Sequence, residues 1–595
     1  MNNNMITNKV RTACPRLLCK LTALPVGVLG LALLSSCSDW DDHYGADTAL
    51  VSSQSATLWQ NISSQPNLSQ FAALLKATGY DEVLSQSQTY TVWAPEDGTF
   101  DYARLSTESS DKLVREFIQN HIARSNYVVS GSVDEKIYML NEKLMPFEGN
   151  GSYTISGVTL DQSNIGSSNG TLHTIGSYLP FMANIYESLS NDQYPIDSIS
   201  DFFHAYEQRE LDELRSVQGP VVDGEITYLD SVFYENNTLF NSFRAYINQE
   251  DSNYTMVLPT NEAWHRARRT IARYYHYLPS FDFMENTSTG EEKKVTAVHL
   301  KDAAFLTDSM TNMMLVRGLI FNNNLYDNKR LMSLQTGQRL QCDSLYSTTY
   351  DKLFADDAAQ LFEGTQRVDK SNGDIFVTDD SLRMHTWSVW NPELRQEAEM
   401  SSLMANTMSA ASANRVYVSE TTQNPAVAGK VSGSYYLEVV PSASNANPEV
   451  DFYLQGVRSA EYALYLVVVP ANIINPNREL KPHRMVITLG NTTDAGRNRE
   501  ERLRNPEDGG NYFVNDSSRI DTMFIGNVTF PIAYVGTGSS QQEYYPYLRV
   551  RSNVTNALSS QYDRTLRIDK IILRPRELDD YLKAHPDYKY DDGTY

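Results

Sequence analysis

Apolar residues recur at helical spacing between residues 58 and 75, and the pattern stops at Gly79. This spacing predicts two short amphipathic helices that end at a glycine. Residues 89–94 are rich in β-branched and aromatic side chains and predict a strand, which Pro95 ends because proline cannot donate to a strand ladder. Another helical pattern covers residues 113–122, so we expect helices and strands to be mixed here.

A hairpin is predicted at the end of this first segment. Asn169-Gly170 stands between two β-rich runs, residues 158–160 and 171–175, and both turn residues tolerate a positive φ. The same order then recurs further along the chain. A helical pattern covers residues 233–247, and a second Asn-Gly pair follows at Asn372-Gly373.

Two motifs in this order of elements resemble those of the fasciclin (FAS1) domain family. The first family motif, a strand ending in Ala-Pro before a helix, is matched by residues 91–100, and the second, which contains Asn-Gly, by residues 168–176. Residues 254–264 repeat the first motif, and residues 371–379 repeat the second.

The resemblance implies two tandem fasciclin-like domains, at residues 55–190 and 195–390. The second is longer because residues 281–294 and 335–364 are inserted between its motifs. Some animal fasciclin domains use a Tyr-His motif in integrin adhesion. The corresponding place here reads Asn120-His121 in the first copy and has no histidine in the second, so we do not expect integrin binding.

From Val416 onward, strand-like runs alternate with Asn, Gly and Pro turns up to Leu573. This pattern predicts an all-β sandwich over residues 415–578, jelly-roll-like and similar in outline to carbohydrate-binding modules. Residues 391–414 are expected to be a linker, and residues 579–595 a surface tail. The predicted fold class is therefore α+β, with two fasciclin-like domains followed by a sandwich.

The amino terminus carries a targeting pattern. Basic residues precede the apolar run of residues 21–34, which is too short to span a bilayer comfortably. The run ends in Leu-Ser-Ser-Cys37, which resembles a bacterial lipobox, so we expect residues 1–36 to be a cleaved signal, Cys37 to carry lipid, and residues 37–54 to form a tether. Residues 38–43 resemble an acidic signal for surface export; the alternative is a soluble acidic tether.

The composition excludes some classes of partner and of structural bond. The chain has 50 Lys and Arg against 73 Asp and Glu, a net charge of −23, which opposes phosphate binding, so we expect no nucleic-acid partner. Of the four cysteines, only Cys342 would remain as a free thiol in the mature chain. An intrachain disulfide and a cysteine-based zinc site are therefore excluded there.

Candidate chemistry is confined to aromatic side chains. The sequence has no zincin, nucleophile-elbow, Walker or EF-hand motif, and we expect no catalytic residue, cofactor or metal. Asp563, Asp569 and Glu577 receive no catalytic assignment. Trp387 and Trp390 are expected to pack between domains. The candidate ligand-binding residues are in a tyrosine cluster that either stacks on sugar rings or packs in a strand: Tyr544, Tyr545 and Tyr547.

Together these features predict a non-catalytic lipoprotein at the cell surface of the outer membrane, held in the bilayer by the lipid on Cys37. The leading hypothesis is glycan binding as an accessory to a SusC/SusD-type transporter, a role suggested by resemblance to fasciclin-containing lipoproteins. An alternative is an adhesin that makes protein contacts through its fasciclin domains. A third hypothesis is a glycan hydrolase in the sandwich.

Overall fold

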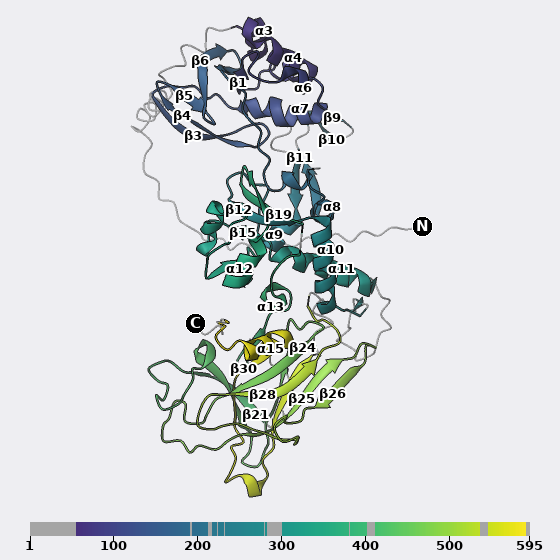
Figure 1. Cartoon of the computed structure of the whole chain (residues 1–595), viewed down its shortest axis with the longest axis vertical. Helices are drawn as coiled ribbons and strands as arrows, with labels where there is room; N and C mark the ends of the chain where they lie inside the picture. The colour runs from purple at the N-terminus through teal and green to yellow at the C-terminus, as the bar shows by residue number, and fades with distance from the viewer. Residues whose placement is uncertain are drawn as a thin grey trace, which may run out of the picture. The chain divides into compact units, whose positions relative to one another are not determined.

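The computed structural model describes residues 55–190, 193–211, 217–222, 224–230, 233–278, 280–281, 300–379, 381–400, 411–535, 546–588 and 590. The chain forms two compact units, Met1–Phe181 and Met182–Tyr595 (Figure 1). Both combine helices with β-sheets, as the sequence patterns predict.

Short helices form one layer of the first unit. The Thr57 hydroxyl accepts from the Gln60 backbone while the Gln60 side chain accepts from the Thr57 backbone, a capping box that starts the first helix. The helix predicted over residues 113–122 is formed by the end of α7 (Ser110–Leu113), a π-helical turn, Val114–Ile118, and a 3-10 turn, Gln119–His121. The α-helices are α3 (Leu58–Ser64), α4 (Ser69–Ala77), α5 (Tyr80–Val83), α6 (Tyr102–Leu105) and α7 (Ser110–Leu113).

A seven-stranded sheet forms the other layer, in the order β2-β1-β7-β6-β5-β4-β3. Successive residues of a strand point to opposite faces, so Val92 joins the core beneath the helices while Trp93 joins a second core on the far side. The strands are β1 (Tyr90–Pro95), β2 (Ile122–Arg124), β3 (Ser132–Tyr138), β4 (Leu144–Asn150), β5 (Tyr153–Ile155), β6 (Val158–Ser167) and β7 (Gly170–Ile175).

The second unit begins with a similar helix-and-sheet arrangement around a four-stranded sheet in the order β15-β12-β19-β18. Trp264, on helix α10, is 3% exposed in its core. The principal elements are α8 (Asp197–His204), α9 (Thr238–Phe243), α10 (Asn261–Ile271), α11 (Ala303–Arg317), α12 (Ala355–Phe362), α13 (Thr386–Val389), β12 (Tyr254–Pro259), β15 (Ile320–Asn322), β18 (Gln366–Lys370) and β19 (Gly373–Thr378).

Short two-stranded sheets accompany this arrangement. The helical pattern of residues 233–247 is only partly realised, because residues 233–237 pair as a strand and Asn237 caps α9 through the Leu239 backbone. The paired strands are β8 (Glu207–Leu211) with β11 (Phe233–Asn237), β9 (Val217–Val222) with β10 (Glu225–Asp230), β13 (Ser280–Phe281) with β14 (Leu300–Lys301), and β16 (Ser344–Tyr346) with β17 (Lys352–Phe354).

Two antiparallel sheets make up the rest of the second unit. Apolar residues from both sheets, such as Leu464, Ile571 and Val550, share one core. One sheet contains β20 (Leu394–Glu397), β21 (Ala411–Tyr417), β22 (Tyr435–Pro441), β24 (Glu461–Val468), β28 (Asp521–Thr529) and β30 (Leu566–Pro575). The other contains β23 (Glu449–Tyr453), β25 (Arg484–Thr492), β26 (Asn498–Arg502), β27 (Phe513–Val514) and β29 (Tyr547–Ser552).

Two segments at the borders of these sheets differ from the expected linker and tail. In the predicted linker of residues 391–414, β20 pairs with residues 570–573 of β30 and satisfies part of its buried backbone, and β21, which begins at Ala411, pairs with β22. After β30, residues 576–584 form helix α15 (Figure 1), whose Leu578 is fully buried. Contacts within the fold therefore hold the described residues of the predicted linker and the part of the predicted tail that belongs to α15.

The two Asn-Gly pairs occupy matching places in the two units. β1 and β7 run parallel with Tyr90 opposite Gly170, and β12 and β19 run parallel with Tyr254 opposite Gly373. A Cβ atom on either glycine would lie 1.8 Å from the facing tyrosine carbonyl oxygen, so only glycine fits. The hairpin predicted at Asn169-Gly170 is confirmed by the antiparallel pairing of β6 with β7.

Each preceding asparagine is buried and joins distant backbone segments. Asn169 accepts from the Leu58 N–H (2.8 Å) and donates to the carbonyl oxygens of Leu84 and Gln86 (2.8 and 2.7 Å). Asn372 repeats this set, accepting from Ile185 (2.9 Å) and donating to two carbonyl oxygens. Those acceptors are Ile247 (2.7 Å) and Gln249 (3.1 Å).

Replacing either asparagine by alanine would leave a backbone N–H and two carbonyl groups without their partner. We expect Asn169→Ala and Asn372→Ala each to lower the free energy of unfolding by about 3 kcal/mol or more, since an unsatisfied buried group costs roughly 1–3 kcal/mol. Denaturant unfolding of the full chain measures this. Asn527→Ala, at an exposed position of β28, is the control. Equal stability of all three variants would contradict the assigned role.

Candidate functional site

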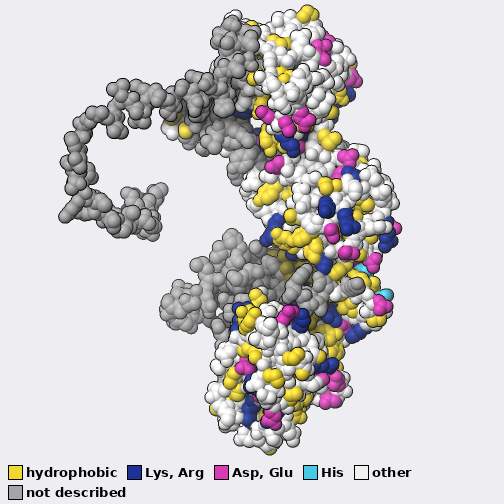
Figure 2. Space-filling model, turned by 90° about the vertical axis from the view of Figure 1, so that its left-hand side faces the viewer, with side chains coloured by type: hydrophobic (Ala, Val, Ile, Leu, Met, Phe, Trp, Pro, Cys, Tyr) yellow, Lys and Arg dark blue, Asp and Glu magenta, His cyan; other side chains and the backbone are white. Residues whose placement is uncertain are grey.

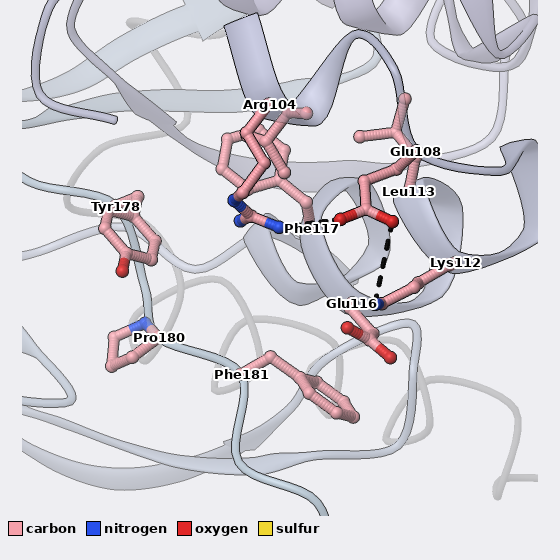
Figure 3. A pocket seen from close by; sticks show the side chains of 10 residues that line it. Arg104, Glu108, Lys112, Leu113, Glu116, Phe117, Tyr178, Pro180 and Phe181 are labelled. Carbon is pink, nitrogen blue, oxygen red and sulfur yellow. Dashed lines mark hydrogen bonds and ion pairs between the residues drawn. The ribbon is translucent and has the colours of Figure 1, made fainter. Parts of the chain in front are cut away.

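A groove of about 180 Å³ opens on the surface of the first unit (Figure 3). Helix α6 supplies Arg104, and the segment that leads through α7 into the π-helical turn supplies Glu108 and Lys112. The residues that line it, called here the first-unit groove, are Arg104, Leu105, Glu108, Lys112, Leu113, Glu116, Phe117, Tyr178, Pro180 and Phe181.

The two walls of the first-unit groove differ in chemistry. Figure 3 shows Tyr178, Pro180 and Phe181 along one side and the charged side chains of Arg104 and Glu108 across from them. Tyr178 is 41% exposed, so part of its ring is open to a ligand. The groove therefore offers a flat aromatic wall opposite hydrogen-bonding groups.

The charged wall is held by weak ion pairs. Glu108 accepts from Arg104 at 2.8 Å and lies 3.6 Å from the Lys112 ammonium, and these two basic side chains are 58% and 50% exposed. Exposed pairs of this kind contribute only about 0.2–1 kcal/mol to stability. A ligand can therefore replace one partner at small cost.

The π-helical turn Val114–Ile118 shapes the floor of the groove. It places Phe117 between the core and the groove: the Phe117 ring lies 5.1 Å from the Phe100 ring and also lines the groove, together with Glu116. Such turns are rare and occur frequently at functional sites. Basic side chains also reach the aromatic wall, because the Lys143 ammonium and the Arg115 guanidinium lie 5.1 and 5.8 Å from the centre of the Phe181 ring.

Charge outside the groove is dispersed. The face of the molecule in Figure 2 has acidic and basic side chains interspersed over its described surface. Glu108 has basic partners within 4 Å, so these local pairs dominate the electrostatics of the groove, because charges more than about 8–10 Å apart are screened by salt.

Two buried histidines of the first unit serve its core. His121 donates from Nδ1 to the Phe117 carbonyl (2.7 Å) and accepts at Nε2 from the Leu179 N–H (2.9 Å). His173 donates from Nε2 to the Tyr127 carbonyl (2.9 Å) and accepts at Nδ1 from Asn164 (3.3 Å). Both rings are neutral and fully hydrogen-bonded, and burial lowers the pKa of each to about 4.

Of the four site residues predicted from the sequence, the structure describes one, Tyr547. Cys37, Tyr544 and Tyr545 lie outside the described residues. Tyr547 begins β29, is 6% exposed, and donates its hydroxyl hydrogen bond to Glu500. Its ring fills the space that a side chain at Gly490 would need, so it packs against protein.

The two tryptophans after the second motif are buried in the second unit. Trp387 stacks on His385 with ring centres 4.3 Å apart and lies 5.2 Å from the Tyr581 ring of α15. Trp390 belongs to the core around β12, and its carbonyl oxygen accepts from the Tyr275 hydroxyl (2.7 Å). Trp387 thus joins the helix-and-sheet part of this unit to the helix that follows β30.

Asp563, Asp569 and Glu577 lie in different surroundings in the second unit. Asp569 is fully buried, and burial raises its pKa to about 8. Asp563 pairs with Arg567 at 2.8 Å, and Glu577 accepts from the Tyr274 hydroxyl at 3.0 Å. Within the described ranges, no group of three or more His, Cys, Asp or Glu side chains is placed to hold a metal ion.

The described helices of the chain are short. In the part of the chain that the structure describes, every helix falls short of the length and apolar content needed to cross a bilayer. Cys342 is a free thiol in the second unit, and burial raises its pKa to about 11. The thiol is therefore protonated and a poor nucleophile at neutral pH.

The helix-and-sheet architecture of the first unit defines a class of small α+β domain, and its family is identified by comparison. Residues 66–180 match the fasciclin domain family, so this segment is a FAS1 domain. The groove-lining residues, apart from Phe181, all fall within this match. A search of curated proteins gave no match.

The chain is also similar to solved structures. A FAS1 domain pair from the insect cell adhesion molecule fasciclin I is 14% identical, with coverage of 54% of this chain and 98% of that chain and a TM-score of 0.19. The CBM22-1 and GH10 modules of Clostridium thermocellum xylanase 10B, complexed with xylohexaose, are 10% identical. That match covers 31% of this chain and 28% of the xylanase chain, with a TM-score of 0.18.

The histidines make the first unit sensitive to acid. Because their folded pKa of about 4 lies below the ordinary 6.5, the unfolded chain binds protons between these values that the folded chain does not. Stability is therefore present above pH 6.5 and falls as the pH drops toward 4, by about 2 kcal/mol per histidine at pH 5.

We expect His173→Gln, whose amide can both donate and accept, to remove about 2 kcal/mol of the stability change between pH 7 and pH 5. Denaturant unfolding at the two pH values measures this difference. His585→Gln, at an exposed position, should leave the change as in the parent chain. An unaltered pH dependence in His173→Gln would show that His173 is not neutral in the folded state.

Proposed function

We propose that this chain is a non-catalytic, lipid-anchored surface protein that binds a glycan. The observation that carries the proposal is the first-unit groove, which combines an exposed aromatic wall with charged hydrogen-bonding side chains in the FAS1 domain. A sugar ring has C–H faces that pack on an aromatic ring and hydroxyl groups that bond to charged side chains. Tyr178 would supply the stacking face, and Arg104 and Glu108 the hydrogen bonds.

The proposal includes a tandem architecture and a C-terminal β-sandwich of jelly-roll type. The matching Asn169-Gly170 and Asn372-Gly373 sites, each beside a parallel strand pair, support a second fasciclin-like domain within residues 195–390. The two antiparallel sheets with a common core support the sandwich. In this arrangement the sandwich offers a further rigid surface beside the second domain.

The proposed location is the outer surface of the outer membrane. The lipobox-like run before Cys37 and the acidic residues after it support this location. A glycan-binding protein held there by lipid would raise the local concentration of its ligand beside a SusC/SusD-type transporter, which is the proposed partner.

Glycan binding is tested with Tyr178→Ala and calorimetry of the full chain against a panel of soluble polysaccharides. Loss of the stacking face should weaken binding about tenfold. Tyr138→Ala is the matched control, because Tyr138 is 54% exposed in the same unit and does not line the groove.

The outcomes of this experiment separate the candidate functions. Binding that is undiminished in Tyr178→Ala would place the glycan site elsewhere. If the panel shows no binding to any glycan, adhesion through protein contacts becomes the better reading of the FAS1 domain. Hydrolysis of a bound polysaccharide, detected as new reducing ends, would contradict the non-catalytic proposal.

Lipid attachment is tested separately with Cys37→Ala. The thiol is the candidate acceptor at the end of the signal, so the variant should lose metabolic lipid label and leave the outer-membrane fraction. The parent chain, processed in parallel, is the positive control. Label retained on Cys37→Ala would contradict the lipoprotein assignment.

A further inference from the structure

A second, smaller cavity of about 70 Å³ lies in the second unit, in the part built around β12. Arg244 follows helix α9, and Tyr346 ends strand β16. Residues from distant parts of the sequence therefore meet here. The lining set, called here the tyrosine cavity, is Arg244, Asn322, Leu325, Tyr326, Asn328, Tyr346, Ser347, Thr348 and Tyr350.

The backbone of the tyrosine cavity is unusual. Arg244, Tyr326 and Tyr350 have positive φ angles of 53°, 53° and 65°. Large side chains rarely adopt this left-handed conformation, and among the described non-glycine residues with positive φ, three of eight line this one cavity. Residues in such conformations cluster at ligand-binding sites, where the surrounding structure holds them.

The side chains present flat aromatic surfaces beside a positive charge. The Tyr326 and Tyr346 rings lie 4.6 Å apart at 33°, and Tyr326 is 58% exposed. The Arg244 guanidinium lies 4.8 Å from the centre of the Tyr350 ring, which is 54% exposed. Within the described part of the chain, no carboxylate forms an ion pair with Arg244, whereas nearby Asp351 is paired with Arg317 at 2.7 Å.

A buried hydroxyl completes the cavity. Thr348 is 8% exposed, and its Oγ1 has no hydrogen-bond partner among the described residues. A buried hydroxyl without a partner costs free energy, so a polar ligand atom placed here would be stabilised. The neighbouring Asn328 amide already donates to the carbonyl oxygens of Asn322 (3.1 Å) and Tyr346 (2.8 Å), so it forms part of the wall.

We infer that the tyrosine cavity binds an acidic sugar unit, a uronic acid, at the end of a glycan. Arg244 binds the carboxylate, Thr348 hydrogen-bonds an oxygen of the same edge, and the exposed tyrosine rings pack on the face of the sugar. The inference rests on the proposed function of glycan binding and names the class of glycan. It adds a site separate from the first-unit groove.

The size of the cavity supports binding of a chain end. A cavity of about 70 Å³ is too small to enclose a whole sugar ring, so it would take the carboxylate edge of one ring and leave the rest of the ring on the exposed tyrosines. The carboxyl terminus of a peptide could also pair with Arg244. It would leave the flat Tyr326 and Tyr346 faces without a matching partner, so the sugar is favoured.

The test is calorimetry of the full-length chain, purified in detergent, with four probes: glucuronate, glucose, an oligogalacturonate and a neutral oligosaccharide of the same length. The parent chain should bind the acidic probes more tightly than the neutral ones. Arg244→Asn removes the charge, and asparagine tolerates the left-handed backbone at this position. It should weaken binding of the acidic probes about tenfold and leave the neutral probes unchanged.

Two further variants make the result specific. Thr348→Val keeps the shape of the side chain and should weaken acidic-probe binding about fivefold through loss of the hydroxyl. Arg415→Asn is the matched control, because Arg415 also lies over a tyrosine ring, Tyr435, at 3.7 Å, but away from the cavity. It should bind all probes as the parent does, and unfolding curves of every variant check that the fold is retained.

The possible failures are distinguishable. If the chain binds glycans but Arg244→Asn binds acidic probes as tightly as the parent does, the inference is overturned and the proposed function stands. If no glycan binds, both are overturned. If a peptide with a free carboxyl terminus binds and loses affinity in Arg244→Asn while uronates do not bind, the cavity is a peptide site and the inference is overturned. A longer oligogalacturonate binding more tightly than glucuronate supports recognition of a chain end over a free sugar.

Discussion

The helix-and-sheet part of each unit depends on the contact between two parallel strands at an Asn-Gly pair. In the first unit the Asn169 carbonyl accepts from the Tyr90 N–H at 3.1 Å, and in the second the Asn372 carbonyl accepts from the Tyr254 N–H at 3.0 Å. The adjoining glycines let the strands approach closely, while the asparagine side chains fix the helix before the sheet and the loop that enters the parallel strand. A two-residue sequence motif thus makes the contacts that join segments far apart in the chain.

Much of this arrangement of strands could be predicted from the sequence, because local sequence patterns indicate where the strands and the hairpin lie. Strand-forming residues before Pro95 and Pro259 identify the two parallel strands that end there, and Asn-Gly identifies the hairpin at β7. The buried role of Asn169 could not be predicted, since its partner Leu58 lies 111 residues away. An Asn-Gly dipeptide ordinarily indicates an exposed turn.

The borders of elements were harder to predict for the same reason. Strand β20 has few apolar residues of its own and forms because β30 needs hydrogen-bond partners along its whole edge. Helix α15 follows a strand directly, and its Asp579, 1% exposed, accepts from the Tyr465 hydroxyl at 2.6 Å and pairs with Lys583 at 2.6 Å. Charged residues in sequence suggest a solvated tail, but here they are satisfied by partners within the fold.

The candidate sites show a similar division. Abundant tyrosine was visible in the sequence, yet composition does not separate buried rings such as Tyr547 from exposed ones such as Tyr178 and Tyr326. The first-unit groove and the tyrosine cavity lie at the ends of helices and strands, where periodic sequence patterns stop. A weak signal existed in the aromatic and proline residues at positions 178–181, which follow β7 without strand alternation. The left-handed conformations in the tyrosine cavity have no signature in the residues that adopt them.

The parallel strand pairs of the two units match in register but carry different side chains at one buried position. Three residues after its glycine, the first unit has His173 opposite Trp93, and the second has Phe376 opposite Val257. The histidine needs a donor and an acceptor from the loops around it, whereas Phe376 packs against Phe362 with ring centres 5.0 Å apart. Acid can therefore destabilise the first unit through His173, whereas Phe376 cannot be protonated. The parallel strand pair thus constrains the backbone at this position but not the type of side chain.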